Sequence, residues 1–96
     1  MFNLVKEKWE EILDYFKNEF EISDVSFNSW IKPLQIYSVD NGMVTLLSDI
    51  PDMIDYIKKK YYIPLKVSIQ EITKEKLDVE FVSKDEIEKR LKTMSV

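Results

Sequence analysis

The side chains that could carry out acid–base chemistry in this 96-residue sequence are carboxylates, lysines, tyrosines and hydroxyls, because it contains 0 Cys and 0 His. The missing residue types exclude thiolate nucleophiles, imidazole bases, disulfides and the usual zinc ligands. Two carboxylate pairs have helical spacing, Glu7 with Glu11 and Asp52 with Asp55. Charged residues at such spacing usually form the solvent-facing side of an amphipathic helix. We therefore expect no enzymatic activity, no catalytic residue, no metal site and no cofactor.

Recognition of nucleotides or nucleic acids has little support in the composition. Phosphate-binding loops and the GXXG loop of KH domains use glycines so that the backbone can approach the ligand closely. The sequence has 1 Gly and a net charge of −4, whereas duplex binding needs a concentrated basic face. Its basic run, Lys58, Lys59 and Lys60, would spread over nearly a full helical turn and mainly aid solubility. Weak binding of single-stranded DNA is the alternative, with Tyr61 or Tyr62 as a stacking platform.

Two helices are expected in the first third of the chain. Residues 2–20 have apolar side chains at steps of three and four, which is the period of a single amphipathic helix. A short second helix is expected around Phe27 and Trp30, after small polar residues that can cap its start. Pro33 should end it, because the residue before a proline avoids helical geometry.

A β-hairpin and a long helix are expected next. Residues 34–39 and 43–47 are rich in β-branched and aliphatic residues and flank an Asn-Gly pair, the strongest hairpin signal. From residue 50 to residue 72 the apolar residues keep a helical step, with Pro51 suited to a first helical position. Pro64 should break or kink this helix near Tyr62, because proline removes a hydrogen bond and clashes with a carbonyl.

A third strand and a final helix complete the predicted order. Leu77, Val79 and Phe81 alternate with acidic residues, which indicates a strand with one solvent-exposed face. Residues 83–86 have the form of a capping box, so a short helix should follow. We expect one α+β domain in residues 1–82, followed by a C-terminal helical extension or the start of a linker in residues 83–96.

A cytoplasmic location is the expectation, because a sequence with 0 Cys fits a reducing compartment most easily. No apolar run approaches the roughly 20 residues that a membrane span needs. Lys6, Glu7 and Lys8 interrupt the first apolar stretch, which disfavours a secretory signal. We therefore expect no membrane contact.

The most distinctive stretch of the sequence is Phe27-Asn28-Ser29-Trp30-Ile31-Lys32-Pro33-Leu34. It resembles the F-x-x-W-[IL]-[KR]-P pattern of the DnaA N-terminal domain family, which forms domain I of the bacterial chromosomal replication initiator. Flanking features also match, among them Trp9 in the first helix, a hairpin straight after the proline, and Tyr61-Tyr62-Ile63-Pro64-Leu65 in the long helix. The resemblance covers nearly all of residues 2–82.

The resemblance implies a KH-like α-α-β-β-α-β fold, with a three-stranded sheet packed on helices, that acts through its surfaces. In that family the domain self-associates weakly, contacts the replicative helicase and binds regulators of initiation. A weak affinity for single-stranded DNA has also been proposed for the family. The resemblance therefore implies protein partners and no chemistry of the domain's own.

The resemblance also suggests which residues contact partners. Trp9 matches the aromatic residue of self-association, with a plain core position as the alternative. Trp30 is the motif tryptophan, expected mainly to anchor the second helix, although a position at the rim would make it a binding hot spot. Contacts with regulators or the helicase would fall on four further positions. At two of them this sequence departs from the family: Ser26 stands where the family often has an acidic residue, and Asp52 stands where the family has an exposed Phe. The four are Ser26, Ser29, Asp52 and Met53.

Two alternatives to an initiator interaction module stay open. One is a KH-like binder of single-stranded nucleic acid that uses Lys58–Lys60 on the long helix. The other is a stand-alone regulator that competes with a full-length initiator for the same partners.

Overall fold

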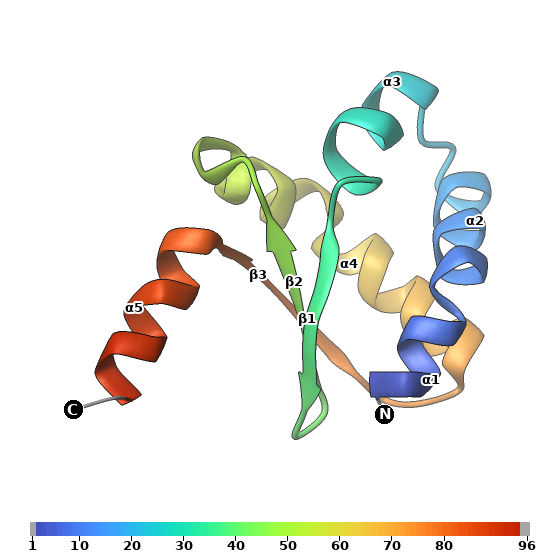
Figure 1. The fold of residues 1–96 in the computed structure, drawn as a ribbon. Coiled ribbons are helices and arrows are strands. Elements are labelled where there is room, and N and C mark those ends of the chain that lie inside the picture. Colours follow the sequence, from blue (N-terminus) through green and yellow to red (C-terminus); the bar gives the residue numbers. More distant parts are fainter. Residues whose placement is uncertain (1, 95–96) are drawn as a thin grey trace.

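The fold is α+β, with helices followed by a three-stranded mixed sheet (Figure 1). The computed structural model describes residues 2–94. Helices α1 and α2 lie to one side of the sheet, α4 runs behind it, and α5 lies on the opposite side (Figure 1). In chain order the elements are α1 (Phe2–Glu7), α2 (Trp9–Glu19), α3 (Asp24–Ser26), a π-helical turn η1 (Phe27–Ile31), β1 (Gln35–Asp40), β2 (Met43–Ser48), a 3-10 turn η2 (Pro51–Met53), α4 (Ile54–Thr73), β3 (Asp78–Ser83) and α5 (Lys84–Met94).

The sheet has the strand order β1-β2-β3, with β1 antiparallel to β2 and β2 parallel to β3. The predicted hairpin is confirmed, because Asn41 and Gly42 both have positive φ, 52° and 76°, as a type I′ turn requires. A bulge between Ile36 and Ser38 interrupts the pairing of β1 with β2. The parallel pair needs a crossover connection, and α4 provides it.

The hydrophobic core lies between the sheet and the helices. The predicted apolar face of α4 is confirmed, since Ile57, Leu65 and Ile69 each have 0% exposed surface. Strands β2 and β3 contribute alternate residues to this core, but the expected solvent-exposed face is incomplete, because Thr45 and Val82 on the other face are buried as well. The core residues that these strands contribute are Val44, Leu46, Val79 and Phe81.

The expected single helix over residues 2–20 is wrong, because the chain leaves helical geometry at Lys8, where φ is −97° and ψ is 7°. Backbone hydrogen bonds persist across the change, from the N–H of Lys8 to the carbonyl of Leu4 (3.1 Å) and from Ile12 to Lys8 (2.8 Å). Helix α1 lies against β1, whereas α2 packs mainly on α4. The apolar periodicity of residues 2–20 is continuous, but packing against two different elements divides the segment into two helices.

Of the break or kink expected near Tyr62, the break is wrong, since α4 runs from Ile54 to Thr73 with Pro64 inside it. Tyr61 and Leu65, on either side of the proline, are both buried in the core. Pro64 has no N–H to donate to the carbonyl of Lys60, and Lys60 is itself an exposed residue. Tertiary packing of the apolar face thus outweighs the local cost of the proline.

The remaining elements agree with the predicted order. The short second helix begins at Asp24, where the hydroxyl of Ser23 accepts a hydrogen bond from the N–H of Ser26 (3.2 Å). The predicted final helix α5 starts after Ser83, whose hydroxyl accepts from the N–H of Glu86 (3.3 Å). Within the described residues, no helix has the length and apolar character to span a membrane.

Candidate interaction surfaces

The first candidate surface is a groove between the N-terminal helices and the start of β1, which we call the Trp9 groove. Trp9 is half-buried, with part of its indole packed against the core. Phe2 keeps 37% of its surface exposed, and the ammonium of Lys6 lies 5.9 Å from the centre of its ring. The groove has a volume of about 480 Å³ and is lined by Phe2, Lys6, Trp9, Glu10, Leu34, Gln35 and Ile36. The structure therefore gives Trp9 a dual position, partly core and partly accessible.

The second candidate surface is centred on Trp30, which the π-helical turn η1 carries. The N–H of Lys32 donates to the carbonyl of Phe27 (2.8 Å), a five-residue step that widens this turn. The indole of Trp30 is half-buried and lies 5.7 Å from the ring centre of Tyr56, which is 41% exposed. Trp30 therefore both anchors η1 and contributes to the surface.

The Trp30–Tyr56 contact brings two stretches that are distant in the sequence into one surface. Ser29 and Asp52 are exposed, whereas Ser26 and Met53 are half-buried. The turn η1, which follows α3, contacts the start of α4 through the rings of Trp30 and Tyr56. We call this set the Trp30 surface: Ser26, Ser29, Trp30, Asp52, Met53 and Tyr56. Trp9 lies apart from it, in its own groove.

Tyr56 was not identified from the sequence, although a signal was present. The apolar stripe of the long helix runs through Ile54, Ile57 and Tyr61, and Tyr56 lies off it. An aromatic residue on the outer side of an amphipathic helix is a frequent mark of a binding surface. Its partner, however, is Trp30, and no short-range pattern links these two positions.

Two lysines of the basic run, Lys58 and Lys60, interact with different groups. Lys60 donates a hydrogen bond to the hydroxyl of Tyr56 (3.1 Å), and its ammonium lies 5.6 Å from the ring centre of Tyr61. The hydrogen bond with Tyr56 is the main reason that the pKa of Lys60 is raised. Lys58 is close enough to Glu80 to help lower the pKa of that carboxyl. The run therefore forms no single basic stripe.

The proposed stacking role of Tyr61 is wrong, because only 1% of its surface is exposed. Tyr62 is half-buried, and its hydroxyl donates a 2.5 Å hydrogen bond to the carboxylate of Asp78. That hydrogen bond, above all, raises the pKa of Tyr62 and lowers the pKa of Asp78. Lys66 lies over the same ring, 5.7 Å from its centre. A base stacking on Tyr62 would therefore compete with an existing cation–π contact.

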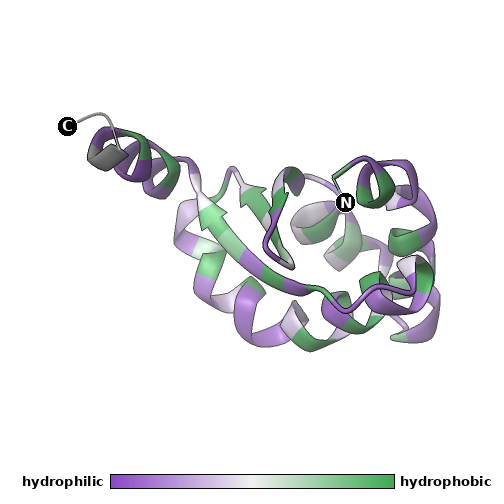
Figure 2. Ribbon diagram, turned by 90° about the horizontal axis from the view of Figure 1, so that it is seen from below, coloured by the Kyte–Doolittle hydropathy of each residue, from purple (hydrophilic) through white to green (hydrophobic). Residues whose placement is uncertain are grey.

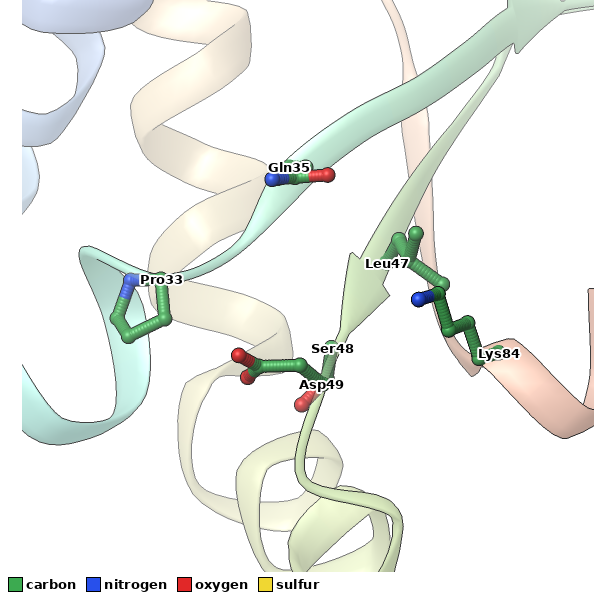
Figure 3. Close-up of a pocket in the computed structure, with 6 residues that line it drawn as sticks. All are labelled: Pro33, Gln35, Leu47, Ser48, Asp49 and Lys84. Carbon is green, nitrogen blue, oxygen red and sulfur yellow. The ribbon is translucent and has the colours of Figure 1, made fainter.

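A smaller cleft lies where β2 ends and α5 begins (Figure 3). In Figure 3 the carboxylate of Asp49 points towards the Pro33 loop, while Lys84 lies beside Leu47 on the other side. The cleft is lined by Pro33, Gln35, Leu47, Ser48, Asp49 and Lys84 and has a volume of about 210 Å³. This is below the roughly 300–1,000 Å³ of typical small-molecule sites. In the part of the chain that the structure describes, no group of three or more acidic residues is placed to hold a metal ion.

Comparison with known proteins identifies the family. The family model described as the DnaA N-terminal domain matches residues 6–71, which is more than half of the chain. The chain belongs to the DnaA N-terminal domain family. The motif resemblance at Phe27–Leu34 is thereby confirmed, and the matched range of this DnaA N-terminal domain includes Trp9 and the whole Trp30 surface.

A relative of known name extends the similarity. The chromosomal replication initiator protein DnaA of Lachnoclostridium phytofermentans (strain ATCC 700394 / DSM 18823 / ISDg) is 34% identical over 101 residues. The alignment covers 99% of this chain but 22% of the relative. The DnaA N-terminal domain described here thus spans about a fifth of the length of the curated relative it matches. Helix α5 lies beyond the family match but inside this alignment.

Proposed function

We propose that this DnaA N-terminal domain is a non-catalytic, cytoplasmic protein-interaction module that helps to assemble a bacterial replication-initiation complex. Its functions would be weak self-association and the docking of the replicative helicase and of initiation regulators. The observation that carries this proposal is that both tryptophans are half-buried at the domain surface, in a chain of this family. Tryptophans in such positions are the commonest hot spots of protein interfaces.

Self-association is assigned to the Trp9 groove. An indole that is already held against the core loses little conformational freedom when a second copy covers it. The neighbouring Phe2 is exposed, so apolar area is available for the contact. Lys6 and Glu10, which also line the groove, supply charges of both signs at its rim.

Sedimentation equilibrium tests this assignment. Trp9→Ala should shift a concentration-dependent monomer–dimer equilibrium towards the monomer by tenfold or more. Val25→Ala is the control, because Val25 is 76% exposed and lies on α3, away from the groove. Equal association of the Trp9 variant and the wild type would refute the role of the groove.

Docking of the helicase and of regulators is assigned to the Trp30 surface. Asp52 is exposed beside the half-buried Met53, so a charge stands next to an apolar contact point. Exchange of an apolar anchor for a charge changes which partners are tolerated. Partners of this protein should therefore carry a polar or basic group opposite Asp52.

Titration with purified replicative helicase from the host organism tests the Trp30 surface. Ser29→Arg, which adds bulk and charge at an exposed position, should weaken binding, and Asp52→Phe should alter the preference between partners. Lys76→Arg, in the loop before β3, is the control. Unchanged affinities for both variants would show that the partner binds elsewhere.

Binding of single-stranded nucleic acid is the alternative function, and the buried Tyr61 and the engaged Lys60 weigh against it. Labelled single-stranded DNA should bind this domain weakly at low salt. Sub-micromolar, salt-sensitive affinity would favour the alternative and demote the interaction module. A stand-alone regulator would share the Trp30 surface, and competition with a full-length initiator for the helicase would reveal it.

A further inference from the structure

The outer side of α4 carries exposed apolar residues that the two surfaces above do not include. Ile63 is 58% exposed and Val67 is 39% exposed. They are four residues apart, so they lie on one face of the helix, one turn from each other. Helix α4 runs along one border of the domain (Figure 2), and its opposite side packs on β3 and α2. These two side chains therefore form a short apolar stripe that faces outwards.

The same part of α4 is basic within an acidic protein. Helix α4 contains four lysines against two acidic residues, Asp55 and Glu71, which lie one turn before Lys59 and one turn after Val67, although the whole chain has a net charge of −4. Lys59 is exposed one turn before Ile63, on the flank of the stripe. Lys66 is on the same flank, and its ammonium is 3.8 Å from the carboxylate of Asp78. The stripe thus combines apolar side chains with an excess of positive charge.

We propose that Ile63, Val67 and Lys59 form a third docking surface, which binds an acidic amphipathic segment of a partner protein. Aliphatic side chains bury apolar surface of a protein partner, whereas single-stranded nucleic acid is held by aromatic stacking. Acidic groups beside the partner's apolar residues would complement the lysines and accelerate association. We call this set the α4 stripe.

A second copy of this domain fits the α4 stripe poorly. Acidic residues that could face the lysines lie on α2, at Glu10, Glu11 and Asp14, and on α5, where the four basic residues Lys84, Lys89, Arg90 and Lys92 outnumber the three acidic ones. Among the described residues, none of the exposed large apolar side chains lies on α2. Docking of α2 would therefore match the charges but leave Ile63 and Val67 without apolar contacts.

The α4 stripe is independent of the proposed initiator function. Ile63 lies about three helical turns beyond Asp52 and Met53. The residues that line the Trp9 groove include none from α4. Failure of helicase binding at the Trp30 surface would leave this inference intact, and failure at the stripe would leave the Trp30 surface intact.

The test is an NMR titration with a synthetic helical peptide. The peptide carries Leu at positions i, i+3, i+4 and i+7 and Glu on both flanks. Backbone resonances of residues 59–70 should shift most on binding. Ile63→Asp should weaken binding by about tenfold, a typical loss for one central contact. Lys59→Glu should weaken it less, and more at low salt than at high salt.

Three controls make the result decisive. Val25→Asp places the same charge on another exposed apolar position and should leave binding unchanged. Thermal unfolding of Ile63→Asp should remain close to that of the wild type, because the residue is exposed. An analogue peptide with Lys in place of Glu should bind at least about tenfold more weakly, because its charges repel the lysines.

Three results would overturn the proposal. They are shifts that map outside α4, an unchanged affinity of Ile63→Asp, and equal binding of the basic peptide. Displacement of the acidic peptide by oligo-dT at equal concentration would instead assign the surface to nucleic acid and would overturn it as well.

Discussion

The indole of Trp30 and the ring of Tyr56 lie 5.7 Å apart, inclined at 59° to each other, and join the turn after α3 to the first turn of α4. Tyr56 also makes an edge contact with the buried Tyr61, at 6.4 Å between ring centres. The three rings therefore connect the protein surface to the core. This arrangement joins Trp30 to the start of α4, which directly follows Asp52 and Met53 in the chain, and the proposed docking of partners depends on this junction.

Removal of the Tyr56 ring should destabilise the domain moderately. Tyr56→Ala is expected to lower the free energy of unfolding by about 1 kcal/mol, which is the typical contribution of an aromatic pair in addition to that of its buried area. Tyr37→Ala is the matched control, because Tyr37 is 43% exposed and its ring pairs with no other ring among the described residues. Urea unfolding compares the two variants, and equal losses would show that the Trp30–Tyr56 contact adds no stability.

Replacement of Lys74 by glycine should stabilise the domain. Lys74 ends α4 with φ at 61°, a left-handed conformation that glycine adopts without strain. Lys74→Gly is expected to raise the free energy of unfolding by about 0.5–1 kcal/mol. Lys76→Gly, at a loop position outside the residues with positive φ, should be neutral or destabilising. A destabilised Lys74 variant would contradict the left-handed cap.

The Glu80–Arg90 ion pair should make stability depend on acidic pH. Arg90 donates to Glu80 at 2.9 Å, and the hydroxyl of Thr45 donates to the same carboxylate at 2.8 Å. The hydrogen bond from Arg90 contributes most, and with the one from Thr45 it holds the pKa of Glu80 below its ordinary value in spite of partial burial. A lowered pKa contributes stability that is present above the ordinary carboxyl value of about 4.3 and is lost as the pH falls through the folded value.

Urea unfolding at several pH values below 6 measures this contribution. Arg90→Gln should reduce the loss of stability on acidification, because protonation of Glu80 then removes a weaker favourable interaction than in the wild type. Glu88→Gln, which removes an exposed carboxylate from the same helix, is the control. An Arg90 variant with the same pH dependence as the wild type would show that the pair contributes nothing.

Loss of the Tyr62 hydroxyl should change the titration of Asp78. The pKa of Asp78 is lowered first by the hydrogen bond from Tyr62 and then by the N–H of Val79, which donates at 2.8 Å. Tyr62→Phe should therefore raise the pKa of Asp78 but leave it below the ordinary value. Carboxyl NMR titration measures this, with Tyr15→Phe on α2 as the control. An unchanged Asp78 would mean that the short hydrogen bond is absent in solution.

The raised pKa of Tyr62 predicts a complementary effect at alkaline pH. A raised pKa contributes stability that is present below the ordinary tyrosine value of about 10 and is lost as the pH rises through the folded value. The wild type should lose this part of its stability above pH 10, whereas Tyr62→Phe should not. Parallel loss in both proteins would contradict a contribution from Tyr62.

Much of the fold follows from short-range information in the sequence. Asn41-Gly42 sets the hairpin, because few residue pairs tolerate positive φ at both positions. Ser83 sets the start of α5 through its own hydroxyl. The Phe27–Leu34 motif indicates the family through consecutive residues alone, and the family match includes it. Tyr61 belongs to the apolar stripe of α4, so its burial was also predictable, and the stacking role suggested for it conflicted with that stripe.

The sequence by itself determined the hairpin, the amphipathic helices, the order of the elements and the family, because turn geometry and periodicity are encoded within a few neighbouring residues. The tertiary structure decided that α1 and α2 part at Lys8, that α4 continues through Pro64, and that Trp30 meets Tyr56. Each of these depends on contacts between residues that are distant in the chain. The free energy of such packing is at least as large as the local conformational preferences that it overrides. A short window of sequence therefore cannot predict these three features.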